Sequence, residues 1–108
     1  ISKAPNSIAL KPGMIFSNEP GYYKEGEYGI RIENLITVKA VETSGDREML
    51  GFENLTWAPL DKNMMEVSML DEAEVKWVNN YHQETYAKLK DRMDGEALDW
   101  LKEVTKPL

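Results

Sequence analysis

Two stretches in the first half of the chain, residues 14–16 and 30–41, carry the β-branched and aromatic residues that are typical of strands. Turn-forming residues border both stretches. Residues 20–29, which lie between them, are rich in Gly and charged residues, a composition that predicts a turn-rich connection. The pattern therefore predicts an antiparallel hairpin.

The register of this hairpin follows if its two arms are symmetric about Gly26. Phe16 then pairs with Ile36, and Met14 pairs with Val38. Because successive side chains point to opposite faces of a strand, these four residues make one apolar face.

The same register places Glu19 opposite Glu33, on the other face. Opposed Cβ atoms lie about 4.5–5.5 Å apart, and two like charges there destabilise a sheet. They are tolerated if a positive group lies between them or if one is protonated, and a metal ion is the first candidate. Arg31 either neutralises Glu33 or orients a metal ligand. The simpler alternative is two solvated carboxylates. Pro20 offers no N–H, so the register just beyond Glu19 stays open.

Polar residues 42–48 interrupt the apolar pattern and mark the predicted domain boundary. We expect residues 1–47 to form one domain, which carries the hairpin, and residues 48–108 to form a C-terminal domain. The second domain should begin with a third extended segment, residues 49–60, which Pro59 helps to close.

The hydrophobic period becomes helical from Asp71 onward. Asp71 with Glu74 three positions later is an acidic variant of the capping box, so a helix should begin here. The apolar face of this helix carries Val75, Val78, Tyr81 or His82, Thr85 and Leu89. Gly95 interrupts the pattern, and a second short helix should run from about Glu96 until Pro107 prevents its continuation. The chain is therefore expected to be of the α+β class.

Composition narrows the classes of function. The chain has 108 residues and a formal net charge of −6, which argues against a nucleic-acid partner because such proteins need a basic face. No apolar run approaches the roughly 18 residues that span a membrane. With no cysteine and one histidine, a Cys–His site is impossible and a Ser–His–Asp site has no independent support.

Residues outside the glutamate pair are first expected to have structural roles. His82, on the first helix, should pack locally or, alternatively, act at an interface or substrate edge. Anchors of the core or of an interface are expected at Trp57, Trp77 and Trp100. Aromatic residues that cover the hairpin or line a substrate cleft are expected at Tyr22, Tyr23 and Tyr28.

Four segments resemble aminopeptidase P, the family of Xaa-Pro aminopeptidases. Residues 17–23 (SNEPGYY) and 29–34 (GIRIEN) are similar to the end of its catalytic domain. Residues 77–82 (WVNNYH) and 97–101 (ALDWL) are similar to the C-terminal region of its long form. The first two motifs are specific, and the order and spacing of the others add weight. The resemblance therefore covers nearly the whole chain. It implies that residues 1–47 are the end of a metallopeptidase catalytic domain and that residues 48–108 are the C-terminal domain.

The resemblance implies the C-terminal part of a pita-bread (creatinase/aminopeptidase-like) fold, with antiparallel strands followed by two helices. It implies two divalent metal ions, usually manganese, held by two aspartates, one histidine and two glutamates. Glu19 and Glu33 match the two glutamates. Glu19 also matches the residue that handles the proton of the attacking water, and Arg31 matches one that supports the ligand carboxylates. In the family, the two aspartates and the histidine lie upstream of the segment that begins here at Ile1. His82 falls in the C-terminal region and not at the ligand position. We expect the chain to be the inactive tail of a longer enzyme.

The implied reaction is the hydrolytic release of an N-terminal residue that precedes proline, so the implied substrate is a peptide with proline at its second position. The expected partners are the rest of the same polypeptide and a second copy in a homodimer, in the cytoplasm. Neither a nucleic acid nor a membrane is expected.

Two alternatives stay open. The chain could be a C-terminal dimerisation or interaction module, because interfaces favour aromatic residues and methionine. Its aromatic-rich helices fit such a role, as do the link residues Met64, Met65 and Met69. It could also be a non-peptidase relative of the same fold. The presence of both Glu19 and Glu33 counts against that alternative.

Overall fold

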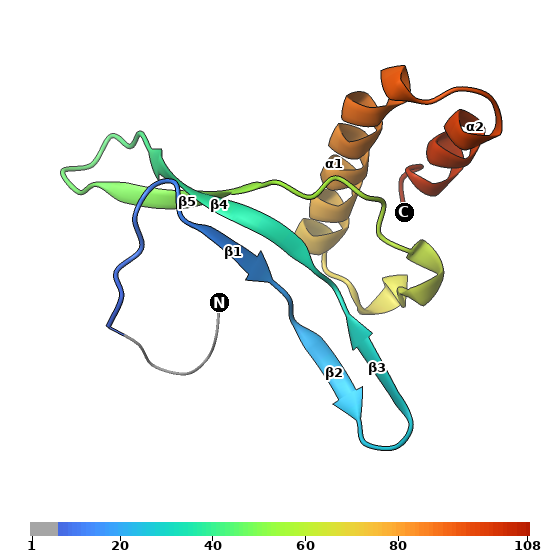
Figure 1. The fold of residues 1–108 in the computed structure, drawn as a ribbon, viewed down its shortest axis with the longest axis horizontal. Helices are drawn as coiled ribbons and strands as arrows, with labels where there is room; N and C mark the ends of the chain where they lie inside the picture. Colours follow the sequence, from blue (N-terminus) through green and yellow to red (C-terminus); the bar gives the residue numbers. More distant parts are fainter. Residues whose placement is uncertain (1–6) are drawn as a thin grey trace. The chain divides into compact units, whose positions relative to one another are not determined.

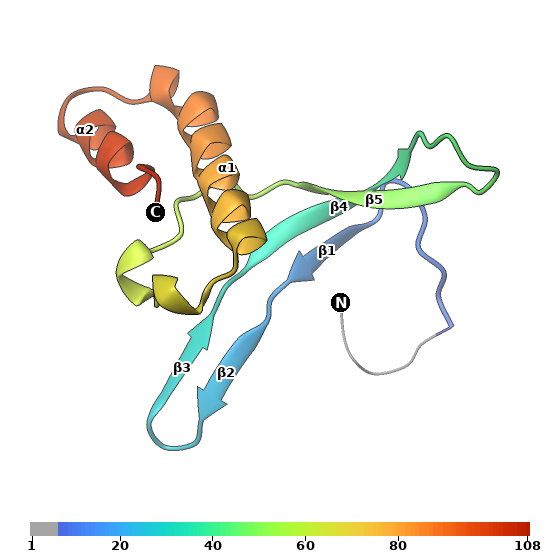
Figure 2. The ribbon, with the colours of Figure 1, turned by 180° about the vertical axis from the view of Figure 1, so that it is seen from behind.

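The computed structural model describes residues 7–108, so the first six residues of the predicted 1–47 domain lie outside the described part of the chain. The chain divides into two compact units, residues 1–56 and 57–108. Figures 1 and 2 show strands in the first unit and helices in the second. The predicted α+β class is confirmed.

The first unit holds a three-stranded antiparallel sheet and a two-stranded hairpin. The sheet has the strand order β1-β4-β5. Its strands are β1 (Ile15–Asn18), β4 (Asn34–Val41) and β5 (Met49–Asn54). The hairpin pairs β2 (Gly21–Lys24) with β3 (Tyr28–Arg31). Figure 1 shows that β2 and β3 continue the paths of β1 and β4 beyond the end of the sheet.

The predicted register is confirmed. Phe16 lies opposite Ile36, and the N–H of Val38 donates to the carbonyl oxygen of Met14 over 2.9 Å. Gly26 lies in the hairpin turn with a φ of 72°, a conformation that glycine adopts without steric cost. The assumption of symmetry about this glycine was therefore sufficient to align the strands on both sides of it.

Two details of the predicted strands were wrong. Residues 20–29 contain strand as well as turn, and the expected strand 30–41 is divided between β3 and β4. The division lies opposite Pro20, which has no N–H to donate to the ladder. The carbonyl oxygen of Pro20 still accepts from the N–H of Ile32 over 3.2 Å, so the register continues through the break.

The sheet buries one face of its central strand. Asn34, Ile36 and Val38 are buried, whereas Leu35 between them is exposed. This alternation agrees with the apolar face predicted for Ile36 and Val38. The predicted third extended segment, residues 49–60, is a strand only as far as the end of β5.

The second unit consists of three short 3-10 helices and two α-helices. They are η1 (Lys62–Met64), η2 (Val67–Met69), α1 (Glu72–Leu89), η3 (Lys90–Arg92) and α2 (Gly95–Val104). Both α-helices were predicted, and the 3-10 helices were not. The capping box is confirmed, because Asp71 Oδ1 accepts from the N–H of Glu74 over 2.8 Å and Glu74 Oε2 accepts from the N–H of Asp71 over 2.9 Å.

The core of the second unit lies along the predicted face of α1. The buried residues are Val78, Tyr81, His82 and Thr85 on α1, Leu101 on α2, and Thr105 after it. The ring of Tyr81 stacks on Trp57 and on Trp77, with ring centroids 5.6 and 5.4 Å away. Trp77 and Trp100 are 49% and 54% exposed, so a core role for these two is wrong and an interface role stays a prediction.

Candidate metal centre

Glu19 and Glu33 face each other in the short gap between the sheet and the hairpin. The pairs on either side are Asn18 with Asn34 and Gly21 with Arg31, so the register places the two glutamates at opposed positions. Their side chains are 44% and 40% exposed, so both carboxylates reach solvent.

The positive group beside the two carboxylates is Arg31. Its Nε lies 3.1 Å from Glu33 Oε2, and its Nη1 lies 3.8 Å from Glu19 Oε2. The pKa of Arg31 is raised, first by the Glu33 carboxylate, next by a hydrogen bond with Tyr23, and to a smaller degree by Glu19. The hydroxyl of Ser17 donates to Glu19 Oε1 over 2.6 Å. The charged guanidinium therefore relieves the repulsion between the opposed carboxylates.

Two glycines, Gly21 and Gly29, make room for the ring of Tyr23 beside this arginine. Gly29 lies opposite Tyr23 in the ladder, and Gly21 lies opposite Arg31. A Cβ atom on Gly29 would lie 2.7 Å from Tyr23 Cδ1, and one on Gly21 would lie 2.8 Å from the Tyr23 hydroxyl oxygen. Cβ atoms do not approach other atoms so closely, so both positions require glycine while the ring lies across them.

The part that Tyr23 plays was missed at the level of sequence, where it was only one of three tyrosines around the hairpin. The signal that could have found it is a glycine two positions before the tyrosine and a second glycine opposite it in the predicted register. Such a pair leaves one face of a hairpin bare, and an aromatic ring can then lie flat on the backbone.

The side chains present fit part of a site for hard divalent cations. Carboxylate oxygens are the ligands that magnesium, calcium and manganese ions favour. Within residues 7–108, no group of three or more His, Cys, Asp or Glu side chains is placed to hold a metal ion. Glu19 and Glu33 can therefore supply only part of a coordination shell, and the other ligands would come from outside the described residues.

His82, the one histidine of the chain, is engaged elsewhere. It is fully buried in the second unit, and its Nε2 accepts a hydrogen bond from the N–H of Leu60 over 3.1 Å. Burial and, after it, the nearby Lys62 ammonium group lower the pKa of His82. The local packing role expected for this residue agrees with its position.

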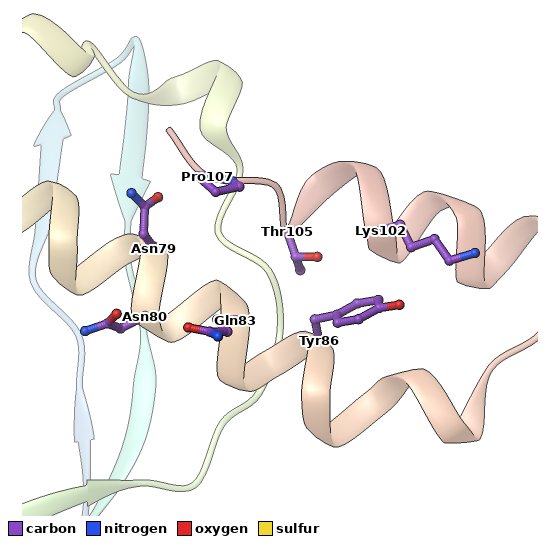
Figure 3. A pocket seen from close by; sticks show the side chains of 7 residues that line it. All are labelled: Asn79, Asn80, Gln83, Tyr86, Lys102, Thr105 and Pro107. Carbon is purple, nitrogen blue, oxygen red and sulfur yellow. The ribbon is translucent and has the colours of Figure 1, made fainter.

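A pocket lies between α1 and α2 and has a volume of about 430 Å³ (Figure 3). Its lining residues are Asn79, Asn80, Gln83, Tyr86, Lys102, Thr105 and Pro107. Polar groups of this lining are used inside the unit, because Asn79 Oδ1 accepts from the N–H of Leu108 over 2.8 Å and the Thr105 hydroxyl donates to the Leu101 carbonyl over 2.6 Å. No carboxylate or imidazole lines the pocket, so it offers no pair for general acid–base catalysis.

Two family models match the chain. The model described as the C-terminal region of peptidase_M24 matches residues 48–108, and the model of metallopeptidase family M24 matches residues 1–40. Among curated relatives, a probable Xaa-Pro aminopeptidase P of Coprinopsis cinerea is 49% identical over 97% of this chain, and one of Talaromyces marneffei is 46% identical over 95%. The chain covers 18% and 16% of these relatives, so it spans less than a fifth of their length.

A solved structure also matches along the whole chain. It is the crystal structure of X-prolyl aminopeptidase from Caenorhabditis elegans, described as a cytosolic enzyme with a di-nuclear active site. The TM-score is 0.84 at 31% sequence identity, and the match covers 100% of this chain and 18% of that one.

None of the helices in residues 7–108 has the length and apolar content to cross a membrane. The resemblance seen in the motifs is confirmed, and the chain belongs to the M24 metallopeptidase family, where it matches the C-terminal portion of aminopeptidase P.

Proposed function

We propose that this chain is the C-terminal part of a metal-dependent aminopeptidase that releases the N-terminal residue preceding proline. The single observation that carries the proposal is the opposed pair Glu19 and Glu33 with Arg31 beside both carboxylates. The M24 family match and the names of the relatives support it. The proposed substrate is a peptide with proline at its second position.

Glu19 and Glu33 would hold two divalent ions together with ligands from the rest of the polypeptide, which the resemblance gives as two aspartates and one histidine. We propose manganese, the ion that the resemblance implies, and carboxylate ligands are compatible with it because they suit hard ions. When bound, such ions polarise the scissile carbonyl and make a water nucleophilic at neutral pH.

Residues of this chain would transfer the proton of the attacking water and would hold the carboxylates in position. Glu19 would accept the proton of the attacking water and deliver it to the nitrogen of the departing proline. Ser17 donates to one oxygen of Glu19, which fixes the carboxylate while its other oxygen points toward Arg31. Arg31 would orient both carboxylates, as groups behind metal ligands commonly do.

The isolated chain should be inactive, since two carboxylates on an exposed hairpin cannot exclude water or complete a metal shell. We also propose that residues 1–47 complete the catalytic domain while residues 48–108 form a distinct C-terminal domain. The ranges of the two family models support this division. A cytoplasmic location is proposed from the description of the worm relative.

A second candidate role for the C-terminal domain is homodimer formation. Large apolar side chains of the second unit are exposed, among them Met64 at 65%, Met69 at 81% and Trp100 at 54%. Methionine and tryptophan are enriched at protein interfaces. Sedimentation of the intact protein with and without residues 62–108 tests this role, and unchanged dimerisation after truncation would exclude it. A non-peptidase relative of the fold would instead lack the upstream aspartates or histidine.

The proposed function is tested in the intact polypeptide with Glu19→Gln and Glu33→Gln. Each variant should lose bound metal and reduce kcat/KM for an Xaa-Pro peptide by at least about 100-fold, the size of an acid–base or ligand contribution. Glu27→Gln is the matched control, because Glu27 is an exposed carboxylate on the same hairpin that pairs with Lys24 over 2.7 Å. Full activity in Glu19→Gln, or rapid hydrolysis by the isolated 108-residue chain, would refute the proposal.

A further inference from the structure

The second unit begins with a segment that has no regular secondary structure, residues 57–61, here called the lead segment. Side chains of α1 make hydrogen bonds to its backbone in two places. The hydroxyl of Tyr81 donates to the Ala58 carbonyl over 2.9 Å and accepts from the Ala58 N–H over 3.3 Å. Farther along, His82 Nε2 accepts from the Leu60 N–H over 3.1 Å. The ring of Trp57, at the start of the segment, also stacks on Tyr81 and lies 4.6 Å from the Lys88 ammonium group. Within these contacts, the Leu60 hydrogen bond is the one that depends on His82.

The bond at Leu60 fixes the protonation state of the imidazole. A ring nitrogen that accepts a hydrogen bond carries no proton, so the neutral ring must carry its proton on Nδ1. His82 is fully buried, and its Nδ1 has no hydrogen-bond partner among the described residues. A second proton can be added only at Nε2, which already faces the N–H of Leu60.

We propose that His82 makes the attachment of the lead segment sensitive to pH. In the imidazolium form, Nε2 carries a proton and faces the N–H of Leu60. Two donors cannot form a hydrogen bond with each other, so the bond between His82 and Leu60 would be lost. The contacts at Trp57 and Ala58 would then still hold the start of the lead segment. Its end would be held only through Lys62 just after it, whose ammonium group donates to the Lys106 carbonyl over 2.8 Å. This inference does not depend on the proposed peptidase function.

The groups around the ring oppose its protonation until the solution is acidic. On η1, the Lys62 ammonium group acts on the ring as a like charge, and on α1 the uncharged ring of Tyr81 lies 6.1 Å from it, centroid to centroid. The carboxylate of Glu103 on α2 pairs with Lys106. Burial of His82, and then Lys62, lower its pKa from the ordinary value near 6.5.

The sign of the pH effect follows from this lowered pKa. The unfolded chain takes up the proton first, near pH 6.5, whereas the folded chain resists it. The full contribution to stability is therefore present above about pH 6.5. As the pH falls below that value, the folding equilibrium constant should decrease by up to about tenfold per pH unit, until the folded pKa is reached.

The first test is nuclear magnetic resonance of the 108-residue chain, in which a single histidine makes the assignment unambiguous. At pH 7.5 the imidazole nitrogens should report the Nδ1–H form. On acidification the ring should titrate below pH 6.5, and the amide of Leu60 should lose protection from hydrogen exchange over the same range. An Nε2–H form, or a Leu60 amide that stays protected after the ring is charged, would overturn the proposal.

The second test compares urea unfolding of the variants between pH 7.5 and pH 5. His82→Gln offers an uncharged acceptor, so it should remove most of the pH dependence in this range. Tyr81→Phe deletes both contacts to Ala58 and should lower stability at every pH while keeping the wild-type slope. An unchanged slope in His82→Gln would refute the proposal, and the resonance experiment on the wild-type chain decides the matter if that variant does not fold.

Discussion

The structure predicts that a substitution of Gly29 disturbs the candidate metal centre, although Gly29 has no side chain that could bind a metal. In Gly29→Ala the new Cβ would lie 2.7 Å from Tyr23 Cδ1 and 3.1 Å from Tyr23 Cε1. Carbon atoms at optimal contact lie about 3.5–4.0 Å apart, so the ring would have to move by roughly 1 Å or more. Such a movement takes the Tyr23 hydroxyl away from Arg31, which holds both glutamates.

The direction in which the Tyr23 ring can move determines how much folding stability Gly29→Ala loses. Tyr23 is 65% exposed, so it can swing into solvent instead of straining the backbone. The loss of folding stability should therefore be at the low end of the overpacking range, about 1 kcal/mol. In the aminopeptidase proposed above, loss of a group that supports the proposed metal ligands should reduce metal affinity or activity by about 10–100-fold. We therefore expect Gly29→Ala to have a much larger effect on metal affinity and activity than on the free energy of unfolding.

The assay combines urea unfolding of the 108-residue chain with metal affinity and Xaa-Pro hydrolysis in the intact polypeptide. Gly45→Ala is the control, because its new Cβ would meet only the Thr43 hydroxyl at 3.9 Å and its φ is not positive. The double variant with Tyr23→Ala isolates the clash, since without the ring Gly29→Ala should have little further effect. If Gly29→Ala were just as harmful in that background, the ring would not be the cause and the reasoning would be refuted.

The remaining predictions concern the second unit. Asp71→Ala removes a side chain that caps α1 and should lower the free energy of unfolding by about 1 kcal/mol, whereas Glu84→Ala at an exposed position of the same helix should change it by less than about 0.5 kcal/mol. Equal stability of the two variants in urea would contradict the capping role. Thr85→Val deletes a hydroxyl that is buried without a hydrogen-bond partner among the described residues, so it should raise the free energy of unfolding by about 1 kcal/mol. A destabilised Thr85→Val chain would show instead that the hydroxyl is satisfied.

The features that could be predicted from the sequence are those set by local rules. The register followed from Gly26 because a two-residue side-chain period leaves no freedom once the centre of a hairpin is placed. The start of α1 followed from Asp71 and Glu74 because a capping box is defined by two side chains three positions apart. The same register predicts the opposition of Glu19 and Glu33, which the strand pairs on either side of them confirm.

The features that could not be predicted depend on side-chain orientation or on single turns of helix. The sequence allowed Arg31 to neutralise one glutamate or to orient a ligand, and the structure places it against both carboxylates, with the longer contact to Glu19. It did not distinguish Tyr23 from the other hairpin tyrosines, because the space left by two glycines exists only once the strands are paired. The 3-10 helices before α1 are single turns held by capping contacts, with no repeat long enough to read as a period.

The arrangement around Arg31 helps to explain why two opposed carboxylates, those of Glu19 and Glu33, are present at neighbouring strand positions where they repel each other. The three charged side chains are each 40–50% exposed, and ion pairs at that exposure are weakened by solvent and salt. The pairing therefore offsets the repulsion between the carboxylates but gives the hairpin little net stability, and two apolar residues at those positions would satisfy a sheet better. Placement of two carboxylates, an arginine and a glycine-supported tyrosine on one face is thus poorly explained by folding. It is well explained if the carboxylates are aligned for cations that are bound with ligands from elsewhere in the polypeptide.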